Sequence, residues 1–303
     1  MPLPIVAHTD YSFPFPTEHR FPMDKFGLLQ RHMRALGILG ESNLHTPKTC
    51  SASDLMMAHC HHYIRRFDLN ELDAKEMRRM GLPWSEGLRH RTFTAPNGTL
   101  LTCELALEHG LASHLAGGTH HAHYDFGSGF CIFNDMAYAA RSMIHRGKAK
   151  RILIFDCDVH QGDGTASILE EDADIFTCSI HCEKNFPHRK ATSDLDVGLG
   201  KAMEDEAYIG VVIDTLDRCL AEFKPDFVIY DAGVDVYAND PLGLLNISLD
   251  GIRGRDSAVL TRTVKRGIPT ATVIGGGYDK DQQALAKRHG IVVEEAYALS
   301  KQI

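Results

Sequence analysis

The stretch Arg151–Thr165, RILIFDCDVHQGDGT, constrains the fold of this chain more than any other. It begins with the apolar run Ile152–Phe155, which is typical of a strand buried on both faces of a parallel sheet. Asp156, Asp158 and His160 follow at two-residue spacing, on one side of the chain if the strand continues. The alternative is a strand that ends in solvated acids beside an unrelated histidine. It is the weaker interpretation, because two acids and a histidine at alternating positions are costly without a cation. The stretch therefore predicts a metal site at the carboxyl end of a strand, where open α/β sheets bind their ligands.

Strands and helices alternate along the chain after residue 110, and a short helix is expected after Gly162-Asp163-Gly164. Helices of ten or more residues between short strands favour right-handed crossovers and a parallel sheet between two helix layers, which is an α/β fold. The expected strands are Leu111–Ala116, Arg151–Asp156, Ile175–Ile180, Phe227–Asp231 and Thr270–Ile274, and the expected helices are Asn134–Arg146, Asp205–Phe223, Leu249–Arg266 and Asp279–Gly290.

Before residue 110 the predicted elements are mainly helical. A loop at residues 82–85 is expected to expose the single tryptophan, Trp84, and residues 184–200 form a long irregular segment near the site. No repeat, low-complexity tract or linker divides the 303 residues, which favours one domain spanning residues 1–303. The elements expected here are a strand at Leu3–Ala7 and helices at Asp24–Leu36, Ser53–Cys60, Tyr63–Phe67, Ala74–Met80 and Gly98–His109.

Composition excludes several function classes. The net charge of -8 gives no indication of nucleic-acid binding or of binding to an anionic membrane, and it would not repel positively charged substrates. The N-terminal residues have neither the basic nor the apolar region of a signal peptide, and no apolar run is long enough to span a bilayer. The eight cysteines are scattered without a C-x-x-C pair, so we expect reduced thiols and a cytoplasmic protein.

Three further motifs lie at the ends of predicted strands. GGTHH at residues 117–121 puts His120 and His121 on a glycine-rich loop, where two adjacent rings can converge. Asp235 follows a strand that ends at the same sheet edge, and Tyr278 follows three glycines. Taken alone, these motifs could be a surface loop, a helix cap and a turn with a packing tyrosine. Four strand ends with complementary chemistry at one edge favour a catalytic site. The pair at 61–62, on a charged helix without glycines, instead indicates plain surface.

The chain resembles the histone deacetylase family in the order and spacing of four motifs, which are GGTHHAHYDFGSGFCIFND, DCDVHQGDGT, YDAGVDVYANDPLG and IGGGYD. The resemblance runs from about His8 to the C-terminal helix. Gln161, which stands where class I and II members carry a second histidine, resembles the class IV branch, and HRFPM at 19–23 and EKNFP at 183–187 resemble its bacterial members. The resemblance implies an arginase/deacetylase-like three-layer α/β/α sandwich around a mostly parallel eight-stranded sheet.

The resemblance also assigns roles to the matching residues. It implies that zinc, or iron as the alternative in the cell, is held by Asp158, His160 and Asp235. No position matches the family's substrate-gripping acid on an early loop. The other implied roles are catalysis by His120 paired with Asp156, by His121 paired with Asp163 and by Tyr278, a substrate channel at Gly129, Phe130, Gly276 and Trp84, and a structural potassium ion at Asp156, Asp158, His160 and Ser179.

The implied reaction is metal-dependent hydrolysis of an N6-acyl-lysine, carrying an acetyl or longer group, by activated water. His121 would carry the proton, and Tyr278 would donate to the developing oxyanion. The expected partner is an acylated protein, and the alternative substrate is a small N-acyl amine such as an acetylpolyamine. A non-catalytic acyl-binding module would need a broken motif, and all motifs are intact. Arginase-like chemistry with two metals is disfavoured because no further acids and histidines could be placed for a second ion.

Overall fold

One eight-stranded sheet runs through the protein, and the computed structural model describes residues 2–302. All its pairings are parallel, in the order β2-β1-β3-β8-β7-β4-β5-β6. The central strands are buried on both faces, as the apolar runs Ile152–Phe155 and Phe227–Ile229 predict for two of them. The strands are β1 Ile5–Val6, β2 Leu44–His45, β3 Leu111–His114, β4 Ile152–Asp156, β5 Ile175–Cys182, β6 Leu195–Leu199, β7 Phe227–Asp231 and β8 Thr270–Val273.

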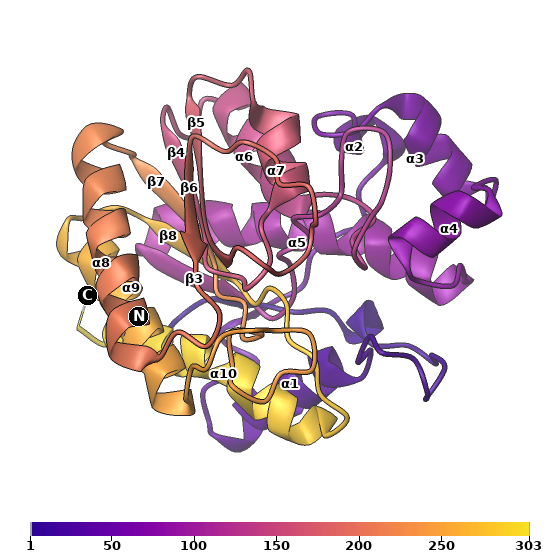
Figure 1. The fold of residues 1–303 in the computed structure, drawn as a ribbon. Coiled ribbons are helices and arrows are strands. Elements are labelled where there is room, and N and C mark those ends of the chain that lie inside the picture. The colour runs from indigo at the N-terminus through magenta and orange to yellow at the C-terminus, as the bar shows by residue number, and fades with distance from the viewer. Residues whose placement is uncertain (1, 303) are drawn as a thin grey trace.

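Helices cover both faces of the sheet, as Figure 1 shows, so the fold is the expected three-layer α/β/α arrangement. No described helix is long and apolar enough to cross a membrane. One layer contains α1 Lys25–Ala35, α8 Asp205–Glu222, α9 Leu249–Lys265 and α10 Gln282–Ser300, and the other contains α5 Glu86–His109, α6 Asp135–His145 and α7 Asp163–Leu169. The short elements η1 Thr9–Tyr11, α2 Ala52–Leu55, α3 His61–Asp68 and α4 Ala74–Met80 complete the N-terminal half.

The structure corrects several expected boundaries. The helix expected from Gly98 begins twelve residues earlier, at Glu86, and continues through Pro96 because it packs along α6 and β3. The helix expected at Ser53–Cys60 is a single turn, and the last helix begins at Gln282 and extends to Ser300. The segment 184–200, expected to be irregular, contains the edge strand β6, whose burial alternates as in a half-solvated strand. The two-residue strand β2 was not expected.

Strand β4 ends at Asp156, where the expected strand Arg151–Asp156 ends, so Asp158 and His160 lie on the loop that follows it. Beyond Asp156, backbone amides donate hydrogen bonds to side-chain carboxylates. The amide of Asp158 donates to Asp156 Oδ1 (3.0 Å), and that of His160 donates to Asp158 Oδ1 (2.9 Å). These local hydrogen bonds compete with the sheet ladder and turn the chain into a loop. The acids that end the strand therefore also shape the loop that carries the site.

Candidate active site

The loops after β4 and β7 bring Asp158, His160 and Asp235 together, as the motif spacing predicts. The three side chains are buried, and one donor atom of each lies within 4.8 Å of the others. His160 Nδ1 lies 3.0 Å from Asp158 Oδ1 and 3.1 Å from Asp235 Oδ2. Asp235 Oδ1 also accepts the amide of Val159 (2.9 Å), so the second loop holds the first in place.

This donor set fits a divalent metal ion. Burial opposes charge on His160, but hydrogen bonds to Asp158 and Asp235 raise the pKa of the imidazole to about 10. A proton therefore provides the positive charge that the two buried carboxylates require. An imidazole and two carboxylates are typical zinc ligands, and three protein ligands leave a position for water or substrate. A bound cation would replace the proton on His160.

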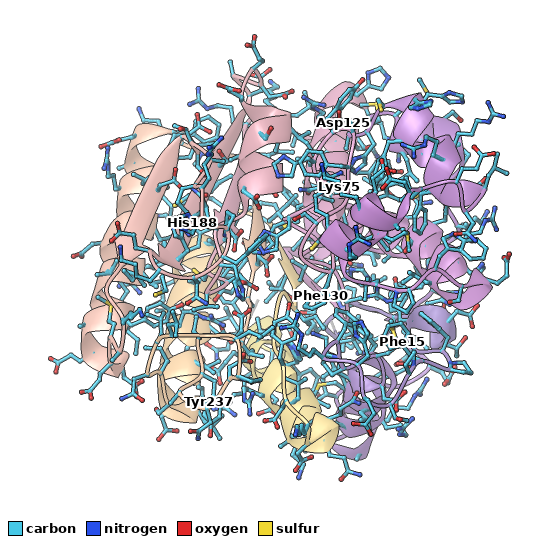
Figure 2. The ribbon with its side chains drawn as sticks, turned by 45° about the vertical axis from the view of Figure 1, so that its right-hand side comes forward. Phe15, Lys75, Asp125, Phe130, His188 and Tyr237 are labelled. Carbon is cyan, nitrogen blue, oxygen red and sulfur yellow. The ribbon has the colours of Figure 1, made fainter. Side chains whose placement is uncertain are left out.

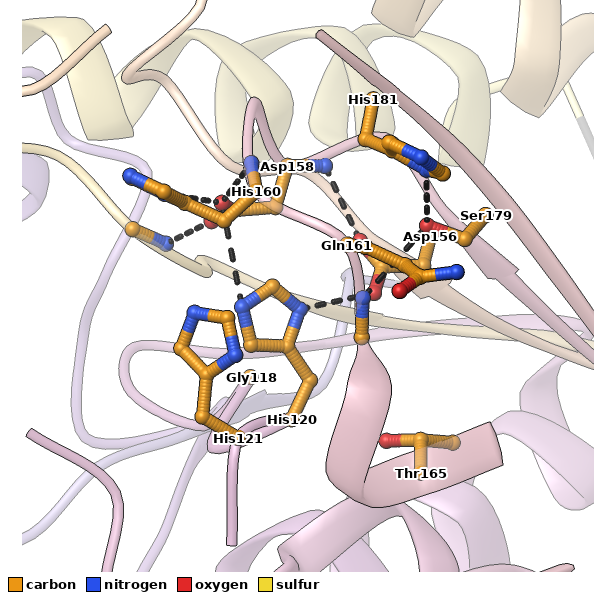
Figure 3. A network of polar contacts seen from close by, with 12 residues as sticks. Gly118, His120, His121, Asp156, Asp158, His160, Gln161, Thr165, Ser179 and His181 are labelled. Atoms are coloured by element: carbon orange, nitrogen blue, oxygen red, sulfur yellow. Dashed lines mark hydrogen bonds and ion pairs between the residues drawn. The ribbon is translucent and has the colours of Figure 1, made fainter. Parts of the chain in front are cut away.

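The adjacent histidines each pair with a different carboxylate. His120 pairs with Asp156 (Figure 3), with Nδ1 2.7 Å from Oδ2, and His121 Nδ1 lies 2.6 Å from Asp163 Oδ1. His120 Nε2 lies 3.8 Å from Asp158 Oδ1, on the side of the candidate metal ligands. The structure thus brings together both predicted pairs, from the glycine-rich loop after β3 and from the β4–α7 connection.

The two histidines differ in charge. Burial opposes charge on both, but the carboxylates of Asp156 and Asp158 outweigh it at His120 and raise its pKa well above the usual value. At His121 burial dominates, the charged His120 adds to it, and the pKa falls to about 4 despite Asp163. At neutral pH the site therefore holds one imidazolium beside one neutral imidazole.

Asp163 binds a second histidine that the sequence reasoning missed. Its Oδ2 lies 3.1 Å from His123 Nε2, and the His123 ring stacks on Phe126 with centroids 4.3 Å apart. The motif HHAH contains His123 two residues after His121, but the spacing alone does not show that one carboxylate serves both. Asp163 is therefore held from two sides, which fixes the orientation of His121.

Asp231 is a second site residue that the sequence reasoning missed. It lies on β7 as the register partner of Asp156 on β4, and it is fully buried. Neither of its carboxylate oxygens has a hydrogen-bond partner within residues 2–302. Burial, with Asp156 nearby, raises the pKa of this carboxyl well above its usual value. His120, Asp156 and Asp231 form a second group of candidate ligand atoms within 4.8 Å of one another. Asp231 is thus a further acid beside the site, where the sequence placed neither acids nor histidines for a second ion.

Tyr278 lies on the wall of the same cavity as His120 and His121. Its ring is 5.7 Å from Phe130 and 6.4 Å from His160, and burial raises the pKa of its phenol, which therefore keeps its proton. The amide of Tyr278 donates to Asp240 Oδ2 (2.8 Å), which anchors the backbone after the three glycines. Gly276 lies beside Asp235 and Asp158, and a Cβ there would collide with both carboxylates.

The site lies between a cleft that opens to the surface and a small inner cavity. A cleft of about 540 Å³ leads in from the surface past Gly129 and Phe130. The turn that carries these two residues is bound to the end of α4, where the amide of Phe130 donates to the carbonyl of Met80 (2.9 Å). The inner cavity measures about 30 Å³, and Gly276 and the buried cations Lys25 and Arg91 lie on its wall.

Trp84 does not lie on the wall of the cleft or of the inner cavity. It is half-buried rather than exposed, and its indole N–H donates to the carbonyl of Phe67 (2.9 Å), at the end of α3. Its assignment to the substrate channel, and the expectation of an exposed ring, are corrected accordingly. Phe186 takes a place at the entrance instead, with its ring edge-on to His121 at 4.8 Å.

Residues around the site support its loops. Gln161 turns away from the metal ligands and binds Asp196 (2.8 Å) and the backbone of Ala191. Ser179, on β5, is the register partner of Asp156 on β4, as a shared cation site requires. The Ser179 hydroxyl also contacts His181 Nδ1 (3.0 Å). The potassium site itself remains a prediction.

Arg255, a residue of α9 that was not predicted to support the site, connects the two loops that carry the candidate metal ligands. Its fully buried guanidinium donates to the carbonyls of Cys157, Ala232 and Gly233 at 2.7–3.2 Å and to Asp256 Oδ1 at 2.9 Å. The loops that carry Asp158 and Asp235 are therefore bound to the same side chain.

Comparison with known proteins agrees with this geometry. The histone deacetylase domain matches residues 19–295. An uncharacterized protein of Picosynechococcus sp. is 47% identical over 292 residues, covering 96% of this chain and 97% of its own length, and histone deacetylase 2 of Arabidopsis thaliana is 29% identical, covering 86% and 70%. The crystal structure of an HDAC homolog complexed with SAHA superimposes with a TM-score of 0.83 at 22% identity, covering 98% of this chain and 84% of the other. The chain therefore belongs to the histone deacetylase family and is a hydrolytic deacetylase.

Proposed function

We propose that this protein is a zinc-dependent deacylase that hydrolyses the side-chain amide of N6-acyl-lysine. The observation that carries the proposal is the pair of buried histidines, a cationic His120 bound to Asp156 and a neutral His121 bound to Asp163, beside the donor set around His160. Such a pair supplies a proton acceptor and a fixed positive charge at one place, which amide hydrolysis requires.

Each residue has a part in the proposed reaction. When held by Asp158, His160 and Asp235, the metal ion would polarise the acyl carbonyl and make water more acidic. His121, neutral and oriented by Asp163, accepts a proton as the water oxygen attacks the carbonyl carbon. It returns this proton to the lysine nitrogen as the carbon–nitrogen bond breaks, so the products are a free amine and a carboxylate.

The other two groups stabilise charge. His120 stays protonated next to Asp156 and supplies positive charge beside the reacting carbonyl. Tyr278, whose phenol keeps its proton, donates its O–H to the oxygen that becomes negative. Both groups are fixed before the reaction, so no reorganisation is needed as the charge develops.

A turnover panel on the purified protein tests this proposal. Acetyl-, longer acyl- and trifluoroacetyl-lysine peptides are compared with acetylated polyamines, and metal content is measured on the same sample. We expect lysine peptides to be hydrolysed, activity to be lost on chelation and restored by Zn²⁺, and Asp235→Ala to contain no metal. Faster hydrolysis of acetylpolyamines would favour the alternative substrate class. A native metal other than zinc would correct the cofactor.

A further inference from the structure

The charged side chains at the entrance of the cleft all have the same sign. Besides the site histidines, the charged residues on its wall are Arg20, Arg78, Arg79 and Lys184, which we call the basic rim. No aspartate or glutamate in the described part of the chain lies on this wall. The whole protein has 40 acidic and 32 basic residues, so the rim has the opposite sign to the molecule.

The basic rim is assembled from three separate segments. Arg20 precedes α1, Arg78 and Arg79 lie in the last turn of α4, and Lys184 follows β5. Side chains from three segments lie around the opening, so the positive potential is centred on the path to the site. In Figure 2, Phe130 of the same entrance lies near the centre of the view, where the N-terminal helices meet the C-terminal half.

These cations are available to a ligand. All four are exposed, and within residues 2–302 none forms an ion pair with a carboxylate. By contrast, Arg66 close by is paired with Glu76 at 2.6 Å, and Arg89 is paired with Asp68 at 2.6 Å. Arg79 stacks on Phe126 at 3.7 Å, an arrangement that orders the side chain and leaves its charge unbalanced.

The entrance also exposes apolar surface. Phe186 is 44% exposed and Leu244 is 39% exposed, and both lie on the wall of the cleft. A small ion does not use such surface, whereas a polypeptide segment covers it with its own side chains. Neighbouring residues of an extended peptide reach about 3.3–3.6 Å each, so residues on both sides of a bound lysine would contact the rim.

We propose that the basic rim selects acyl-lysines that are flanked by aspartate or glutamate in the substrate protein. This inference rests on the proposed function and specifies its substrate class. It also departs from the expectation, drawn from the net charge, that positively charged substrates are not repelled. A cationic polyamine and a lysine-rich tail are both repelled at the entrance.

Three matched acetyl-lysine peptides that differ only in flanking charge test the proposal. We expect kcat/KM to fall from acidic to neutral to basic flanks, by about tenfold or more between the extremes at low salt, and the order to disappear at high salt. The double variant Arg78→Glu with Lys184→Glu leaves two cations and two carboxylates on the rim, so it is expected to abolish the order of the three peptides.

Lys75→Glu is the control, because Lys75, labelled in Figure 2, is an exposed cation of the same helix α4 and is not among the residues on the cleft wall. It is expected to keep the wild-type order. Equal kcat/KM for all three peptides, or a preference for basic flanks or acetylpolyamines, would overturn the proposed selection by the rim. Failure to hydrolyse even the neutral peptide would instead reject the proposed function, so the two failures are distinguishable.

Discussion

At the scale of single residues, two adjacent histidines have different protonation because different partners surround them. His120 lies between two carboxylates, whereas His121 has one carboxylate and a charged neighbour. In the proposed reaction the proton acceptor is therefore His121. A general base contributes about 10²–10⁴-fold to the rate. We expect His121→Ala to lower kcat by about that factor with unchanged metal content, and Asp163→Asn to have a smaller effect.

Steady-state rates and metal analysis of the same samples check this prediction. The exposed His62→Ala variant is the control for loss of an imidazole elsewhere. A near-wild-type rate for His121→Ala over the neutral pH range would move the proton transfer to His120.

Tyr278→Phe removes one hydroxyl and leaves the ring contacts to Phe130 and His160 in place. Loss of one oxyanion donor costs about 10²–10³ in kcat. Because the bond strengthens in the transition state, kcat is expected to fall much more than substrate affinity. A trifluoroacetyl substrate, whose carbonyl is more electrophilic, is expected to lose less than an acetyl one. Small, equal losses on both substrates would indicate that Tyr278 only packs.

The site residues that the sequence predicts are those that directly follow buried strands. Asp158, His160 and Asp235 are of this kind, because the ends of parallel strands meet at one sheet edge. Lys25 and Arg255 were missed because they lie on helices, and only the packing of α1 and α9 against the sheet brings them to the site. Trp84 was misplaced because a loop position does not tell which backbone carbonyl will accept its indole proton.

At the scale of elements, α9 supports the site through one side chain. Arg255→Met would remove the guanidinium from three carbonyls and leave Asp256 with the Tyr230 hydroxyl but no cation, and breaking a buried ion pair costs about 3–5 kcal/mol. We expect a loss of stability of that size in denaturant unfolding, with weaker metal retention. Arg255→Lys keeps the charge but not the planar set of donors, so it is expected to lie between Met and wild type.

The neighbouring Arg253→Met is the matched control for this prediction. Arg253 lies on the same helix, is 43% exposed in its side chain and pairs with Glu294 and Glu295. Surface pairs contribute about 0–1 kcal/mol, so this variant is expected to unfold close to wild type. Equal losses for Arg253→Met and Arg255→Met would contradict the special role of the buried network.

Element types were easier to predict than element limits. Phe227–Asp231 and Ala74–Met80 coincide with β7 and α4, because clear end signals enclose each run. The start of α5 was missed because Pro96 normally interrupts a helix, and packing against α6 outweighs this local effect. Local signals therefore set most elements, and tertiary contacts set their lengths.

At the scale of the whole molecule, global stability depends on pH through a buried cation. Lys25 is 2% exposed, its ammonium donates to the carbonyl of Gly277 (3.2 Å), and no carboxylate among the described residues pairs with it. Burial lowers the pKa of this lysine to about 8, against about 10.4 in an unfolded chain. Between these two values the unfolded chain binds more protons, so the contribution of Lys25 to stability rises with pH.

Lys25→Met removes this dependence and keeps the aliphatic volume. From the difference between the two pKa values, we expect the variant to be more stable than wild type by up to about 3 kcal/mol at pH 7, with the gap closing towards pH 10. Denaturant unfolding at both pH values, with equal metal content, measures the difference and cancels other titrating groups. The exposed Lys287→Met variant is expected to show no such trend. A gap between wild type and Lys25→Met that stays constant from pH 7 to pH 10 would show that burial does not penalise this ammonium.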